Sequence, residues 1–100
     1  MIKKGDFVLI RTTTAGIHFG TLVSRKAQEA HLSNARRLWS WQGALSLSEV
    51  AMKGVTLSSS KISTPVDEII LTQATEIILI NPKSNLPGNE KANSNIPATA

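Results

Sequence analysis

The chain has 100 residues with a formal net charge of +4, and only four of them are aromatic. This length makes one domain at most, and it leaves a lone monomer so little buried surface that we expect a homo-oligomer. The chain has no cysteine, which excludes disulfides and thiolate metal ligands. A cytoplasmic location fits that composition.

Positive charge gathers in the first half of the chain. Residues 1–41 carry seven Lys and Arg against two acidic residues, whereas residues 42–100 carry four lysines against five carboxylates. An anionic partner is therefore expected to meet the first half. Asp6 comes before any long apolar run, so we expect no signal peptide. The longest apolar runs, such as 77–80, are too short to span a bilayer. We expect no membrane association.

The first third of the chain predicts three strands. Residues 7–12, 17–24 and 29–33 are rich in β-branched and apolar residues, and 25–28 reads as a turn. Gly20 inside the second strand predicts a bulge or a close backbone approach. Three strands with short turns form a meander. We therefore predict a mainly β fold, with an SH3-like or Sm-like barrel of about five strands and one short helix.

The one helix is predicted by its capping residues. Ser46 is the expected N-cap, and Glu49 three residues later completes a capping box. Leu45 and Val50 are placed to form a hydrophobic staple, and Gly54 is the expected C′ residue. The helix is about two turns long, so it needs packing on the sheet.

Two strongly apolar stretches follow the helix. Residues 66–71 and 75–80 predict strands that are central in the sheet, or that the helix and a neighbouring subunit cover on both faces. After Asn81 the composition shifts to proline and asparagine. We therefore predict a folded domain over 1–81 and a disordered tail over 82–100.

The residues give no support for catalysis. His18 and His31 lie on different predicted strands with no neighbouring carboxylate pattern and too few further ligands for a metal. Asp67 and Glu68 precede a strand, where adjacent residues point to opposite faces, so they are poorly placed to act as an acid/base pair. No phosphate-binding glycine loop is present. We predict a protein that is not an enzyme and has no cofactor or metal.

The most chemically distinctive stretch is 34–43, which holds both tryptophans and two of the four arginines. In an extended chain Arg37, Trp39 and Trp41 share one face, and Arg36 points to the other. Guanidinium and indole groups side by side are suited to phosphate and to a stacked base. In the alternative interpretation, the tryptophans pack in the core with the arginines lying over them.

Two further segments extend the candidate site. The helix start brings free backbone N–H groups and the hydroxyls of Ser46 and Ser48 to a positive dipole end, although an ordinary capped helix explains the same residues. Arg11 and Thr13 belong to a basic strand end and a hydroxyl-rich loop, which also reads as a simple turn. The predicted ligand-binding residues are therefore Arg36, Arg37, Trp39, Trp41, Ser46, Ser48, Arg11 and Thr13.

Segments spread over residues 3–80 resemble a small domain family found widely in bacteriophages and prophages. They include 4–12, 35–44 and 68–78, and the second holds the core pattern Ala-Arg-Arg-x-Trp-x-Trp-x-Gly-Ala. Ser40 stands where the family pattern suggests an aromatic residue between the tryptophans. The family has been described mainly as uncharacterised, so the resemblance implies a phage origin and one domain but no catalytic residues.

A phage origin favours binding functions. Some small phage proteins are oligomeric "sponges" that sequester cyclic nucleotide or cyclic ADP-ribose signals of bacterial immunity, and this chain is similar to them in general character. The leading hypothesis is a protein of the host cytoplasm that binds such a small phosphorylated nucleotide. The alternatives are a nucleic-acid-binding small barrel and a structural or protein-interaction module.

Overall fold

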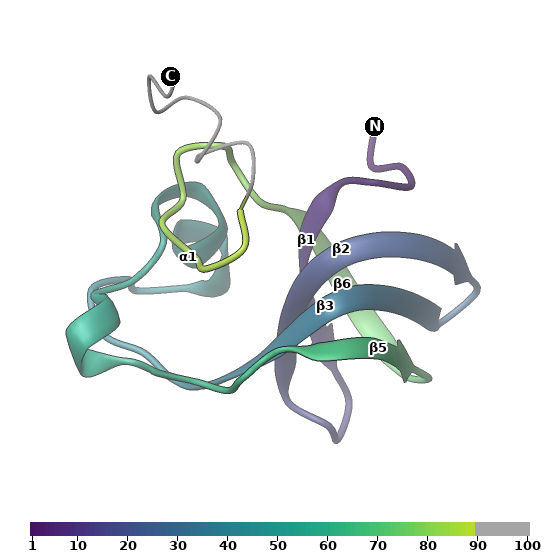
Figure 1. Cartoon of the computed structure of the whole chain (residues 1–100), viewed down its shortest axis with the longest axis horizontal. Helices are drawn as coiled ribbons and strands as arrows, with labels where there is room; N and C mark the ends of the chain where they lie inside the picture. Colours follow the sequence, from purple (N-terminus) through teal and green to yellow (C-terminus); the bar gives the residue numbers. More distant parts are fainter. Residues whose placement is uncertain (90–100) are drawn as a thin grey trace.

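Three antiparallel strands form the first part of the fold. The computed structural model describes residues 1–89, and in it β1 (Phe7–Thr12), β2 (Ile17–Lys26) and β3 (Glu29–Ser40) follow one another as a meander (Figure 1). The predicted meander is confirmed. The second and third strands are longer than predicted, because β3 continues through the arginines and Trp39 instead of ending at residue 33.

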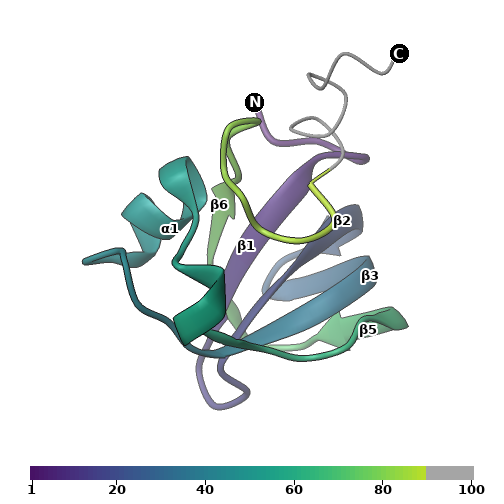
Figure 2. The same cartoon turned by 60° about the vertical axis from the view of Figure 1, so that its left-hand side comes forward.

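The remaining elements wrap the sheet into a strong curl. They are the helix α1 (Leu47–Lys53), a 3-10 turn (Leu57–Ser59), β4 (Lys61–Ile62), β5 (Val66–Leu71) and β6 (Ala74–Leu79). The strand order is β4-β3-β2-β1-β6, and β5 pairs with another part of β3. Only two residues connect β5 to β6, yet these strands lie at opposite ends of the sheet. The sheet must therefore curl until its two edges approach each other (Figure 2).

The mainly β class with one short helix is confirmed. The curl resembles a barrel but stays open, since no strand ladder joins β5 to β6 among residues 1–89. The seam is closed locally at the turn between these two strands. There the backbone N–H of Thr13 donates to the Gln73 carbonyl (3.1 Å), and the N–H of Ala74 donates to the Gln28 carbonyl (2.8 Å).

The composition of the two apolar strands near the end of the domain predicted that they are central in the sheet or covered on both faces. The structure differs from this prediction. Both are at the ends of the sheet, and each leaves a large apolar side chain in solvent: Ile70 of β5 is 56% exposed and Leu79 of β6 is 43% exposed. The apolar composition of β5 and β6 reflects the contact of each strand with an apolar core on one face. It does not indicate how many neighbouring strands each of them has in the sheet.

Two apolar clusters lie on the two faces of the sheet. The inner cluster fills the curl and draws on β1, β2, β3 and β5, with members Val8, Ile10, Leu22, Ala30, Leu32, Ala35 and Leu71. The outer cluster lies between the sheet and α1, with Leu9, Phe19, Val50 and Leu86 among its members. In it the Phe7 and Phe19 rings meet edge to face, 5.9 Å apart. Burial on both faces therefore holds β1 and β2 rigidly in place.

The helix has the predicted cap with one difference. Ser46 is the N-cap and its Oγ accepts from the Glu49 N–H (3.3 Å), but Glu49 Oε1 accepts from the N–H of Leu45 (2.6 Å) instead of Ser46. The predicted staple is wrong, because Leu45 is 96% exposed and Val50 is buried. Gly54 ends the helix with φ of 92°. In the part of the chain that the structure describes, no helix has the length and apolar character to cross a membrane.

The folded domain extends beyond the predicted boundary at residue 81. Leu86 is buried against the outer cluster, and Ser84 Oγ donates to the Val50 carbonyl of α1 (3.1 Å). The Asn85 side chain pairs with both backbone groups of Val55, at 2.9 and 2.7 Å. A disordered tail from residue 82 is thus wrong for residues 82–89, and the rest of that prediction lies outside the described residues. The proline- and asparagine-rich composition predicted disorder, although the segment contains a leucine, Leu86, that is buried in the core.

Candidate ligand-binding site

A β-bulge decides which arginine of β3 faces the inside of the curl. Asn34 and Ala35 of β3 lie opposite the single residue Gly20 of β2. Asn34 takes a positive φ of 48°, and a Cβ on Gly20 would lie 2.9 Å from a backbone oxygen of β3. The extra residue reverses the alternation of side chains. Consequently Arg37, and not Arg36, lies on the inner face of the sheet. The bulge predicted at Gly20 explains this orientation.

A second bulge turns a tryptophan outward. Leu38 pairs with Ile62 of β4 and Ser40 pairs with Lys61, so Trp39 is an extra residue with no partner in that ladder. Its side chain is 65% exposed. Bulges of this kind re-aim one side chain, and here the bulge presents an indole to solvent next to Arg37.

His18 lies directly across the β2–β3 ladder from Arg37 and is 2% exposed. Its Nε2 lies 2.9 Å from the Ala15 carbonyl oxygen, which can only accept, so Nε2 carries the hydrogen and Nδ1 is an acceptor. Burial lowers the pKa of His18 below its ordinary value of 6.5, and the charge of Arg37 lowers it further, although the Ala15 bond opposes both. The imidazole is therefore neutral at pH 7.

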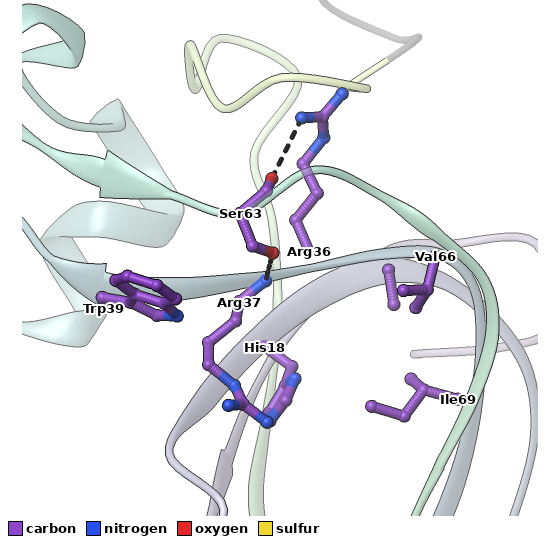
Figure 3. A pocket seen from close by; sticks show the side chains of 8 residues that line it. His18, Arg36, Arg37, Trp39, Ser63, Val66 and Ile69 are labelled. Carbon is purple, nitrogen blue, oxygen red and sulfur yellow. Dashed lines mark hydrogen bonds between the residues drawn. The ribbon is translucent and has the colours of Figure 1, made fainter.

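Ser63 holds the two arginines of β3 in different ways (Figure 3). The Arg37 N–H donates to Ser63 Oγ (2.8 Å) and the Ser63 N–H donates to the Arg37 carbonyl (2.9 Å), so both bonds fix the Arg37 backbone. The Arg36 guanidinium donates to the Ser63 carbonyl at 3.3 Å. The Arg37 guanidinium makes no ion pair or hydrogen bond with any residue in 1–89. It points away from Arg36 and is available for a ligand.

Three pockets have Arg37 in their walls, and we call them together the Arg37 groove. The central pocket, of about 160 Å³, lies between His18, Trp39, Ser63 and Ile69. The threonine pocket, also about 160 Å³, is lined by Thr12, Thr14 and Gln73, and the outer pocket, of about 450 Å³, by Gly16, Ile17 and Trp39. No Asp or Glu of the described chain lines any of the three. The groove therefore offers a cation, hydroxyls and an indole without a competing carboxylate.

The predicted aromatic pair is divided between the groove and the core. Trp39 lines the groove, whereas Trp41 packs against the outer cluster and donates from Nε1 to the Ala44 carbonyl at 3.2 Å. The core interpretation thus holds for Trp41, and Trp39 stays exposed at the groove. The predicted single face of Arg37, Trp39 and Trp41 is wrong, because the bulge at Trp39 interrupts the alternation and β3 ends at Ser40.

The predicted helix-start site does not join the groove. Ser46 Oγ is occupied by the Glu49 N–H, and Ser48 is exposed and does not line the groove. The Glu49 carboxylate itself lies at the helix start, where the Leu45 N–H and then Lys53 lower its pKa. This negative charge occupies the end of the helix where an external anion would bind, so the predicted convergence on one ligand is wrong.

The other predicted residues lie beside the groove without lining it. Arg11 forms a 3.6 Å ion pair with Glu76 across the β1–β6 ladder, and Thr13 binds the turn that closes the seam. Its neighbour Thr14 lines the threonine pocket instead, donating to Gln73 Oε1 at 3.3 Å. The hydroxyl-rich loop therefore does reach the candidate site, through a different threonine.

Sequence reasoning missed the residues that other strands bring to the groove. His18, Ser63, Ile69 and Gln73 come from segments far apart in the chain. No local signal in the sequence marks them, because only the curl of the sheet brings them together. His31 was expected to lack a carboxylate, yet its Nε2 lies 2.7 Å from Glu68 Oε1 on β5. Within residues 1–89 no three metal-ligating side chains gather in a possible metal site.

Comparison with known families places the chain in one of them. The family described as Domain of unknown function (DUF6948) matches residues 5–86. The chain belongs to this family. The range of the DUF6948 match includes every strand that builds the groove and reaches Leu86, the buried residue that packs beyond the predicted domain boundary. No curated protein and no solved structure matches the chain.

Proposed function

We propose that this DUF6948 domain binds a small phosphorylated nucleotide in the Arg37 groove without transforming it. One observation carries the proposal: the guanidinium of Arg37, which has no protein partner among residues 1–89, lies beside an exposed indole in a groove without carboxylates. An exposed guanidinium without an ion-pair partner is free to hold an anion, and an exposed indole leaves apolar surface in water. In a nucleotide ligand, a phosphate pairs with the Arg37 guanidinium and the base stacks on the Trp39 indole.

Each residue of the groove has a distinct role in this proposal. Arg37 holds a phosphate through its planar, bidentate donors. Trp39 stacks on the base, an interaction worth about 1–3 kcal/mol per base in single-stranded nucleic acid complexes. The neutral imidazole of His18 has an Nδ1 acceptor that suits a ligand hydroxyl or amino group. Arg36 supports the site by anchoring the chain at Ser63.

The biological use that we propose is sequestration of a cyclic nucleotide or cyclic ADP-ribose signal by a phage protein in the host cytoplasm. This part rests on the resemblance carried by residues 35–44. It also includes a homo-oligomer, for which the exposed apolar residues Val66, Ile70 and Leu79 on the edge strands supply surface. Light scattering coupled to size exclusion measures the oligomer directly, and a mass of 10.8 kDa would contradict it.

The test of binding is calorimetric titration with cyclic dinucleotides and cyclic ADP-ribose isomers. We expect one of them to bind, with Arg37→Ala and Trp39→Ala each weakening it by roughly ten-fold or more. Arg25→Ala is the matched control, since it removes an exposed arginine that does not line the groove. No heat with any member of the panel, or equal losses in all three variants, would overturn the proposal.

The rival functions give different results in the same experiment. A nucleic-acid-binding barrel would bind oligonucleotides with a log affinity that falls linearly with log salt. An interaction module would bind none of these compounds. In the Trp41→Phe variant, Trp39 is the one remaining tryptophan. If the domain is an interaction module, the fluorescence of Trp39 would stay unchanged with every nucleotide.

A further inference from the structure

We infer that the ligand carries two separate phosphates, one held by Arg37 and one by Lys61, on either side of a base stacked on Trp39. This inference rests on the proposed function and extends it to the class of ligand. The shared chemistry is a nucleoside unit with phosphate groups at both its 3′ and 5′ oxygens, as in a cyclic dinucleotide. Lys61 has no role in any motif of the sequence.

Trp39 lines two hollows of the surface. One is the Arg37 groove. The other is a fourth pocket of about 250 Å³, whose remaining lining residues are Ser60, Lys61, Ile62 and Ser63. The bulge places Trp39 as the extra residue opposite the Lys61–Ile62 step of β4. A ring stacked on this indole thus lies beside both hollows.

Lys61 is the available polar group of the fourth pocket. Its side chain is exposed and makes no ion pair with the part of the chain that the structure describes. The neighbouring hydroxyls are already engaged: Ser60 Oγ donates to the Thr56 carbonyl (2.8 Å), and Ser63 Oγ donates to the Thr64 carbonyl (3.1 Å). No carboxylate lines the pocket to neutralise the lysine. A second anion is therefore the ligand that this pocket suits.

The two cations are carried by neighbouring strands, and Trp39 lies between their positions along β3. Lys61 pairs with Ser40, three residues along β3 from Arg37. At about 3.3 Å per residue and about 4.8 Å between strands, the two backbones are roughly 11 Å apart. A nucleoside whose base stacks on Trp39 carries its 3′ and 5′ oxygens on one sugar, so it can present a separate phosphate to each cation.

The decisive experiment compares ligands that differ by one phosphate. The four ribonucleoside 3′,5′-bisphosphates and the matching 5′-monophosphates are titrated calorimetrically into the full chain and into Lys61→Ala. We expect a bisphosphate to bind about ten-fold tighter than its monophosphate, and we expect Lys61→Ala to remove that advantage. Lys83→Ala is the matched control, because Lys83 is exposed and does not line the fourth pocket, and it should keep the full ratio.

The outcomes separate this inference from the proposed function. Equal binding of bisphosphate and monophosphate, or an unchanged ratio in Lys61→Ala, overturns the two-phosphate ligand and leaves the Arg37 groove intact. A lack of binding by every nucleotide overturns both. A five-residue oligonucleotide forms another arm of the test. If it binds much more tightly than every bisphosphate and every cyclic dinucleotide, the occupant is a nucleic acid strand and the small-ligand inference is wrong.

Discussion

His18 and Arg37 lie directly opposite each other on β2 and β3, one buried and neutral, the other exposed and charged. Side chains at paired positions project to the same face of a sheet. The cation therefore disfavours a second positive charge on the imidazole, and burial disfavours it more strongly. This pair joins the structural core to the candidate ligand site.

The His18–Arg37 pair makes stability depend on pH. The folded state holds the pKa of His18 below 6.5, so below this pH the unfolded state binds more protons than the folded state. Stability at pH 7 and above should be full, and it should fall as the pH drops through 6.5 towards the folded-state pKa. Denaturant unfolding between pH 5.5 and 7.5 measures this. His18→Gln should lose this part of the pH dependence, and parallel profiles for the two proteins would contradict the prediction.

Gly20 should resist replacement by alanine. A Cβ there meets the Ser33 carbonyl oxygen at 2.9 Å and the Ala35 Cα at 3.0 Å, and both atoms belong to the backbone. Such crowding costs roughly 1–3 kcal/mol, and it disturbs the bulge that sets the position of Arg37. We expect Gly20→Ala to lower the free energy of unfolding by that amount. Ser24→Ala, at an exposed position of β2, is the control, and equal stability of the two variants would argue against the bulge.

The two tryptophans should differ in what they stabilise. Trp41→Ala removes a side chain that packs on the outer cluster, so we expect it to cost about 1–3 kcal/mol of stability. Trp39→Ala should change stability by no more than about 0.5 kcal/mol, because its side chain is 65% exposed. Thermal and urea unfolding of both variants check this. A large loss of stability in Trp39→Ala would show a structural role for the indole.

The segment after β6 should be part of the folding unit. Leu86 is 2% exposed and lies in the outer cluster, so Leu86→Ala should lower stability by about 2–5 kcal/mol. Lys83→Ala, an exposed position in the same segment, should leave stability almost unchanged. Urea unfolding of the two variants makes the comparison. A Leu86→Ala protein as stable as the unsubstituted chain would place the domain boundary back at residue 81.

Local patterns determined the elements of this protein. Alternating β-branched and apolar residues predicted the strands, and Ser46 with Glu49 predicted the start of the helix, because these preferences act over a few residues. Gly20 also marked a real bulge in advance. The sequence by itself therefore determined a mainly β domain with one short helix, and it directed attention to the arginines and tryptophans of β3.

Only the tertiary structure decided which of these residues meet. Two bulges in β3 broke the simple alternation, so Arg37 and Trp39 reached the groove while Trp41 packed in the core. The curl of the sheet brought His18 to this site, and β4 brought Lys61 beside Trp39. These relationships join residues far apart in the chain. They depend on ladder register and sheet curvature, which are set by packing of the whole domain and are not encoded in any short segment.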